Sequence, residues 1–301
     1  MTELVGTVLE RDGAAYRVAT EAGEVRAVLR GKAKRDAPRV VVGDVVRLEP
    51  PPLGELHGIV AVEPRRSLLE RRTPEGRGTR PVAANLDQVL VVAATRDPDP
   101  VPQLLDRLLV LAEADELGAA VVVNKIDLDP GTALIERLRR AGYAVYPTSA
   151  ATGEGVAALR DRLRGKTSVV TGPSGAGKSS LLNAVQPGLR LRTGEISARV
   201  RRGRHTTVSA LMIPLADGGY LLDTPGFSEV GVWGIEPREL GSCFPDMRPF
   251  LGRCRYADCR HMREPGCAVR EAVAAGAIAP DRYGSYAALL LEVETAPRRW
   301  E

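Results

Sequence analysis

Short apolar runs alternate with turn residues through the first part of the chain. Segments such as LVGTVLE, AAYRVAT and EVRAVLRG are each only a few residues long, and RDG and EAG separate them. Short strands that follow one another with turns between them are typical of a small all-β barrel. We therefore expect residues 1–64 to form a barrel of about five strands. Residues 65–81 are basic and rich in glycine and proline, and we expect a linker or mobile segment there.

From residue 86 onward the hydrophobic pattern changes. LDQVLVVAA, AAVVVNK, YAVYP and TSVVTG predict buried strands, and the segments between them place leucines at helical spacing. Strands that alternate with helices predict a parallel sheet covered on both faces. After a helix expected at 178–185, VSALMIPL and GYLLD flank ADGG and predict a hairpin. From about residue 237 we expect short helices around a Cys/His cluster.

The segment GPSGAGKS at residues 172–179 fits the pattern G-x-x-x-x-G-K-[ST]. Its glycines let backbone N–H groups point at phosphate oxygens, and the following helix adds partial positive charge. Lys178 would reach the β- and γ-phosphates, and Ser179 would give a hydroxyl to Mg²⁺. The strand before the loop and the helix after it argue against an ordinary glycine-rich turn. The residues expected to bind nucleotide here are Gly172, Pro173, Ser174, Gly175, Ala176, Gly177, Lys178, Ser179 and Ser180.

Asn124, Lys125 and Asp127 belong to an NKID segment at the end of a predicted strand. A carboxylate there can accept hydrogen bonds from guanine N1–H and N2–H₂, and adenine offers no such pair, so the site would reject adenine. Asn124 can brace the loops and face guanine N7, while the Lys125 stem can lie over the base. Backbone N–H groups of Ser149 and Ala150 would face guanine O6. A chance match is disfavoured because the chain has 42 basic residues but only five lysines, and only three asparagines.

Two further segments predict the switches of a GTPase. Asp223 begins DTPG, where the carboxylate would bind Mg²⁺ through water and the Gly226 N–H would sense the γ-phosphate. In the GRHTT segment upstream, Thr206 or Thr207 would reach Mg²⁺ as the first switch, and the spacing does not choose between them. His205 is a candidate for orienting the attacking water, although a positioning or RNA-contacting role fits equally well.

The order of these motifs indicates a circular permutation. In an ordinary GTPase the phosphate loop comes first and the base-reading loops come last, whereas here NKID precedes GKSS. Domain termini are often close together, so such a cut leaves the sheet intact. Position 227, where many GTPases have glutamine, is Phe227, so we expect slow intrinsic hydrolysis. DTPG also leads directly into the C-terminal segment, which the second switch could then reorient as a body.

Three of the four cysteines and one histidine form the cluster Cys254, Cys259, His261 and Cys267. Thiolates and an imidazole at this density suit one structural, tetrahedral Zn²⁺ with no open position. The alternative is buried or redox-active cysteines. A disulfide fits poorly in a cytoplasmic chain. We expect the remaining cysteine, Cys243, to belong to the core.

Composition narrows the function classes. The chain has 301 residues, 44% hydrophobic and 27% charged, which is a normal globular balance and enough for two or three domains. No apolar run is long enough to span a membrane, and the start lacks a signal-peptide layout, so a cytoplasmic protein is expected. The net charge of +4 is compatible with nucleic acid. Basic residues gather around one hairpin of the predicted barrel and suggest a phosphate-contacting surface, or else a solvated charged loop: Arg26, Arg30, Lys32, Lys34, Arg35 and Arg39.

Together these motifs resemble one family, the ribosome small subunit-dependent GTPase A (RsgA) family of circularly permuted GTPases. The resemblance covers nearly the whole chain and includes AANLDQVLVV, NKIDL, TSAATGEG, GPSGAGKSSLLN, GRHTT, LLDTPGF, the FPD at 244–246 and CRYADCRHMREPGCAV. It implies an OB barrel at 1–70, a GTPase domain at 71–230 and a helical zinc domain at 231–301. It also implies binding to the small ribosomal subunit and its rRNA late in maturation, with hydrolysis stimulated by the subunit. Val208 departs from the family, which often has threonine there.

Two other functions are compatible with parts of the sequence. A metabolic or kinase-type P-loop enzyme would not need NKID followed by TSA, and nucleotide competition would test it. A GTPase of the large subunit would have no use for the barrel, and sedimentation would test that. The sequence therefore predicts a GTPase, expected to be monomeric, that uses GTP, Mg²⁺ and one zinc ion and acts on the small ribosomal subunit.

Overall fold

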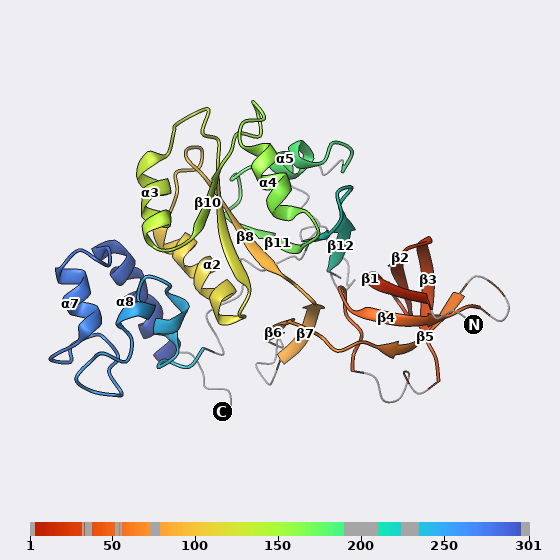
Figure 1. The fold of residues 1–301 in the computed structure, drawn as a ribbon, viewed down its shortest axis with the longest axis horizontal. Coiled ribbons are helices and arrows are strands. Elements are labelled where there is room, and N and C mark those ends of the chain that lie inside the picture. The colour runs from red at the N-terminus through yellow and green to blue at the C-terminus, as the bar shows by residue number, and fades with distance from the viewer. Residues whose placement is uncertain are drawn as a thin grey trace. The chain divides into compact units, whose positions relative to one another are not determined.

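The computed structural model of the protein describes residues 4–31, 33, 38–51, 54, 56–72, 79–189, 210–223 and 235–295 (Figure 1). The chain divides into two compact units. The first comprises Met1–Asp87, Leu163–Val169 and Ile196–Pro225, and the second comprises Gln88–Arg162, Val170–Glu195 and Gly226–Glu301. Among the helices in the described ranges, none has the length and apolarity needed to cross a membrane.

The N-terminal segment forms the closed five-stranded barrel that the alternating pattern predicts. Its strands are β1 (Leu4–Asp12), β2 (Ala15–Thr20), β3 (Gly23–Leu29), β4 (Val45–Glu49) and β5 (Leu56–Val62). They close in the order β1-β2-β3-β5-β4, in which β3 and β5 are parallel and the other neighbouring strands are antiparallel. Alternate side chains such as Val8, Val18, Val46, Leu48 and Ile59 are fully buried inside. This Greek-key connectivity is that of an OB barrel.

The segment expected to be a linker contains a second, two-stranded sheet, so that expectation is wrong for much of its length. β6 (Leu68–Arg72) pairs antiparallel with β7 (Thr79–Ala84), with a register shift beside Pro81. The proline is tolerated because irregular pairing there asks for no ladder hydrogen bond from its nitrogen. Arg65, just before β6, donates to both carboxylate oxygens of the buried Asp44 at 2.7 and 2.9 Å. The sequence did not reveal this ion pair, because Arg65 belongs to a segment rich in basic residues.

A six-stranded sheet has the order β10-β9-β8-β11-β13-β12. Its strands are β8 (Gln88–Ala94), β9 (Gly118–Asn124), β10 (Ala144–Pro147), β11 (Thr167–Thr171), β12 (Leu211–Pro214) and β13 (Tyr220–Asp223). β9 is parallel to both β8 and β10, β11 is parallel to β13, and β12 forms the expected hairpin with β13. β8 is buried at every position, as strands covered on both faces are.

In the part of the chain that the structure describes, four helices accompany this sheet: α2 (Pro102–Ala114), α3 (Thr132–Arg140), α4 (Val156–Leu163) and α5 (Lys178–Val185). α2 and α3 are neighbours, since Arg137 pairs with Asp106, and α4 meets α5, since Arg160 donates to the Val185 carbonyl at 2.9 Å. The two pairs lie on different sides of the strands in Figure 1. The positions of all four helices match the leucine-rich segments of the sequence.

The C-terminal module, residues 235–295, consists of short helices and loops. Its elements are η1 (Leu240–Cys243), η2 (Arg248–Phe250), α7 (Ala268–Ala274) and α8 (Pro280–Thr295). Its core joins Val110 and Leu111 of α2, so the module and this helix share one hydrophobic cluster. Cys243 is buried in that core, where burial raises the pKa of its thiol to about 11. The expectation that Cys243 belongs to the core is therefore confirmed.

Candidate functional site

The phosphate loop connects β11 to α5, as its motif predicts. Gly172 has φ 141°, and a Cβ added there would lie 2.1 Å from the Val92 carbonyl oxygen. Gly177, with φ 86°, begins α5, and a Cβ there would lie 2.4 Å from the Asn124 amide nitrogen. Only glycine fits at these two positions, because a side chain would strike the backbone of β8 or the Asn124 side chain, and because the backbone conformation disfavours any other residue. The conformation of the phosphate loop is therefore determined by its packing against Val92 and Asn124, without a bound phosphate.

Lys178 lies folded over this loop. Its ammonium donates to the carbonyl oxygens of Gly172 and Pro173 at 2.8 and 2.9 Å. Burial lowers the pKa of this lysine, because the surroundings solvate the charge poorly. A cation that is poorly solvated and held by two carbonyls of the phosphate loop fits a polyphosphate, whose oxygens would replace the two carbonyls. Ser179, predicted to reach Mg²⁺, is buried directly beside it.

Asn124 joins the base-reading segment to the phosphate loop. Its side-chain amide donates to the Ala176 carbonyl at 3.0 Å, and its carbonyl oxygen accepts from the Ala150 N–H at 3.1 Å. The Thr148 hydroxyl lies 3.4 Å from the same oxygen. One buried side chain thus connects the loops after β9, β10 and β11. The bracing role expected of Asn124 accounts for all three contacts.

Asp127 is the exposed member of this site. One of its carboxylate oxygens accepts from the Ser149 hydroxyl at 2.5 Å, which leaves the carboxylate held in place but open on one side. The backbone N–H of Ser149 donates to Glu154 at 3.0 Å, and that of Ala150 donates to Asn124. These two N–H groups, predicted to face guanine O6, have protein partners here. Binding of the base through them would require an exchange of hydrogen bonds.

Several predicted site residues lie outside the described residues, and nothing is said of their structure. These are His205, Thr206, Thr207, Gly226 and Phe227 of the switch segments and Lys32, Lys34 and Arg35 of the barrel hairpin. Asp223 is described as the last residue of β13, in backbone only. The described switch element therefore ends where DTPG begins, at the end of a strand that pairs with β11.

The four predicted metal ligands converge in the C-terminal module. The ligand atoms of Cys254, Cys259, His261 and Cys267 all lie within 4.8 Å of one another. The Cys254 and Cys267 sulfurs are 4.0 Å apart, and they lie 3.4 and 3.5 Å from His261 Nδ1. Tetrahedral zinc with ordinary bond lengths would place sulfur atoms about 3.8 Å apart and sulfur about 3.5 Å from nitrogen. The donor set and its spacing therefore fit Zn²⁺, with Nδ1 as the imidazole ligand.

The surroundings of the cluster hold it in shape. Burial lowers the pKa of His261, which favours the neutral imidazole that binds a metal. The hydroxyls of Tyr283 and Tyr286 on α8 donate to the carbonyls of His261 and Arg260 at 2.7 and 2.8 Å. Helix α8 is therefore connected to the backbone that presents the imidazole. Sequence reasoning found the four ligands but not these two tyrosines.

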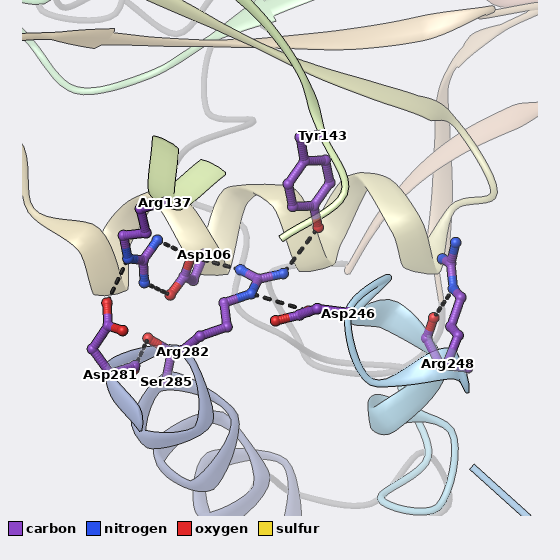
Figure 2. Close-up of polar contacts among 9 residues, drawn as sticks. Asp106, Arg137, Tyr143, Asp246, Arg248, Asp281, Arg282 and Ser285 are labelled. Atoms are coloured by element: carbon purple, nitrogen blue, oxygen red, sulfur yellow. Dashed lines mark hydrogen bonds and ion pairs between the residues drawn. The ribbon is translucent and has the colours of Figure 1, made fainter. Parts of the chain in front are cut away.

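Arg282 of α8 joins this module to the helices beside the base-reading loop. Figure 2 shows its guanidinium between Asp106, Tyr143 and Asp246, with donor–acceptor distances of 2.6, 3.1 and 3.4 Å. Arg282 is 1% exposed and Asp106 is fully buried. The Asp106 carboxylate also accepts hydrogen bonds from both terminal nitrogens of the Arg137 guanidinium on α3, at 3.0 and 2.7 Å. Apart from Asp246, which belongs to the FPD segment of the family resemblance, no motif marked these residues in the sequence.

Comparison with known proteins places the chain among GTPases of ribosome assembly. Residues 62–233 match the family model described as RsgA GTPase. A protein of Gemmatimonas aurantiaca named small ribosomal subunit biogenesis GTPase RsgA is 50% identical over 297 residues, covering 96% of this chain and 97% of its own. A protein of the same name from Moorella thermoacetica is 45% identical over 291 residues, with the same coverage.

Solved structures agree along the whole chain. The crystal structure of YjeQ from Thermotoga maritima is similar with a TM-score of 0.83 at 35% identity, and the match covers 98% of this chain and all of that one. The structure of YloQ, described as a circularly permuted GTPase, has a TM-score of 0.80 at 30% identity, covering 99% and 98% of the two chains. The fold of this chain is therefore shared with both structures over nearly its whole length.

Proposed function

The chain belongs to the RsgA GTPase family, and on that premise we propose that it hydrolyses GTP in the biogenesis of the small ribosomal subunit. The observation that carries the proposal is the Asn124 side chain, which connects a phosphate loop with two loops suited to guanine. A site assembled in this way can hold a guanine nucleotide with its base and its phosphates on adjoining loops.

The described residues suggest how the reaction is supported. Lys178 would exchange its two carbonyl partners for β- and γ-phosphate oxygens. The backbone N–H groups of the phosphate loop would donate hydrogen bonds to the remaining negatively charged phosphate oxygens. Ser179, Asp223 and one of Thr206 or Thr207 would hold Mg²⁺, which neutralises charge on the phosphates. Because Phe227 cannot orient a water molecule, we propose slow hydrolysis until the partner or His205 completes the site.

A basic area of the barrel is proposed to contact rRNA. The pKa of Arg39 is lowered, first by burial and then by the charges of Arg80 and Arg11. Like charges gathered around Arg39 favour an anionic partner such as a phosphate backbone. We further propose the domain limits 1–70, 71–230 and 231–301, one structural zinc, and action as a monomer in the cytoplasm.

GTP turnover with and without each purified ribosomal subunit tests the function. We expect slow basal hydrolysis and strong stimulation by the small subunit alone. A fast basal rate that neither subunit changes would contradict the proposal. Stimulation by the large subunit alone would identify a different partner, and competition by ATP as strong as by GTP would indicate an adenine-nucleotide enzyme.

A further inference from the structure

A short segment after β8, residues 95–98, contacts the nucleotide loops although no motif singles it out. Its first residue, Thr95, is 8% exposed. The Thr95 N–H donates to the Asn124 carbonyl at 3.0 Å, and the Thr95 hydroxyl donates to the Lys125 carbonyl at 2.7 Å. One threonine therefore holds two consecutive carbonyls of the base-reading segment.

The second of these carbonyls belongs to a residue in an unusual conformation. Lys125 has φ 66°, the left-handed region that side chains other than glycine rarely adopt. Such a conformation persists only where the surroundings over-determine it. The Thr95 hydroxyl donates its hydrogen bond to the carbonyl of Lys125, and Asp127 follows two positions later in the chain. The direction of the Asp127 carboxylate therefore depends on the turn that Thr95 secures.

The rest of the segment strengthens this attachment. The Lys125 ammonium donates to the Asp97 carbonyl. A Cβ added to Gly131, just before α3, would lie 2.6 Å from the Thr95 methyl group, and one added to Gly175 would lie 3.0 Å from Pro98. The segment thus lies against the base-reading loop, the start of α3 and the phosphate loop at once.

We infer that Thr95 is a positioning residue for guanine recognition, acting through the backbone of Lys125 rather than by touching the base. The inference rests on the proposed guanine site. With the hydroxyl in place, the Asp127 carboxylate is held where it can accept from the base N1–H and 2-amino group. Without it, the Lys125 carbonyl is left with the Leu128 N–H, at 2.9 Å, as its donor, and the left-handed turn is held less firmly, so the site discriminates less between bases.

The test compares GDP with IDP, which differs by lacking the 2-amino group. Dissociation constants are measured by calorimetry with Mg²⁺ for the wild type, Thr95→Val, Thr95→Ala and Thr95→Ser. We expect both variants without the hydroxyl to lower the preference for GDP over IDP about tenfold, the usual effect of one lost hydrogen bond in a buried polar network. Thr95→Ser keeps the hydroxyl and should stay within about twofold of the wild type. The control, Thr132→Val at the exposed start of α3, should not change the preference.

Equal weakening of GDP and IDP in a folded variant would make Thr95 merely structural and overturn the inference. Two hydroxyl-free variants are included because either one that folds, judged by circular dichroism, gives the answer. Asp127→Asn separates this outcome from failure of the guanine site itself. If that variant does not bind XDP in preference to GDP, the base-reading assignment is wrong. If it does while Thr95→Val keeps the full preference, only the role of Thr95 is wrong.

Discussion

The nucleotide loops and the C-terminal module are held by different kinds of contact. In the loops, neutral groups such as the Asn124 amide and the Thr95 hydroxyl donate hydrogen bonds to backbone carbonyls, and the Lys178 ammonium is held by two carbonyls that phosphate oxygens would replace. The module instead depends on buried charges far apart in the sequence, since Arg282 and Asp106 are separated by 176 positions. Changes in the loops should therefore alter binding and turnover, whereas changes in the module should alter stability.

This difference also affects how the exchange of GTP for GDP could change the conformation of the C-terminal module. Because DTPG leads into the module along the chain, the sequence alone allows the second switch to reorient the whole module as a body. Arg282 and Asp106 are buried, and the module shares its core with α2, so such a swing would leave buried charges unpaired. We therefore expect GTP-dependent changes in the switch segments while α8 stays attached to α2 and α3.

Removal of zinc should give the largest effect and test the module side of the comparison. We expect one zinc per chain in the wild type and almost none in Cys259→Ala. Because binding energy of a structural zinc is folding energy, on the order of 10 kcal/mol, residues 235–295 should lose hydrogen-exchange protection. Metal analysis by mass spectrometry measures the content. Cys243→Ala, outside the cluster, is the control and should keep its zinc; freshly purified wild type without zinc would refute the site.

Loss of the buried arginine comes next in size. Arg282→Met would remove the positive charge that balances the negative charges of the buried Asp106 and Asp246. The free energy of unfolding should therefore fall by about 3–5 kcal/mol. Urea unfolding measures it, and GDP affinity should change little. The control is Arg96→Met, since Arg96 and Asp129 are 58% and 41% exposed and their pair should contribute under about 1 kcal/mol. Similar losses in the two variants would remove the distinction between buried and exposed pairs.

Loss of the phosphate-loop lysine should reverse this pattern. Lys178→Ala removes the cation that would meet the γ-phosphate, and we expect turnover to fall about 10²–10³-fold. Its free energy of unfolding should hardly change, because burial already disfavours the charge. Subunit-stimulated GTP turnover and urea unfolding are measured together. Lys166→Ala, at the residue before β11, should retain turnover, and equal losses in both variants would show a general effect of charge.

The sequence predicted the loops far better than the module's attachment. A phosphate loop or NKID segment is contiguous, and its chemistry dictates both residue types and spacing, so Lys178 and Asp127 could be found without a structure. The metal ligands could be found for the same reason. Arg282 and Asp106 could not, since a charged residue on a helix usually faces solvent and only the fold brings these two together. Thr95 was missed because a hydroxyl that supports a backbone carbonyl follows no pattern.

The smallest effect concerns the outer end of the buried network, where Arg137 meets Asp281 at 2.5 Å (Figure 2). Burial alone would raise the pKa of Asp281, but the hydrogen bond and charge of Arg137 outweigh it and lower that pKa below 3.8. A carboxyl whose pKa is lower in the folded state stabilises the fold above its unfolded pKa and loses that contribution as the pH falls through the folded one. Because Asp281 is 49% exposed, the contribution should be under about 1 kcal/mol.

Asp281→Asn isolates this contribution from the other carboxyl groups. Urea unfolding at pH 7 and near pH 3 should show a slightly less stable variant at pH 7 and a smaller difference from the wild type at the lower pH. The bond from Arg137 to Asp106 remains in the variant, so the buried part of the network is not disturbed. A variant that is equally destabilised at both pH values would mean that Asp281 acts through packing, and the stability of this junction would then come from Asp106 and Arg282 alone.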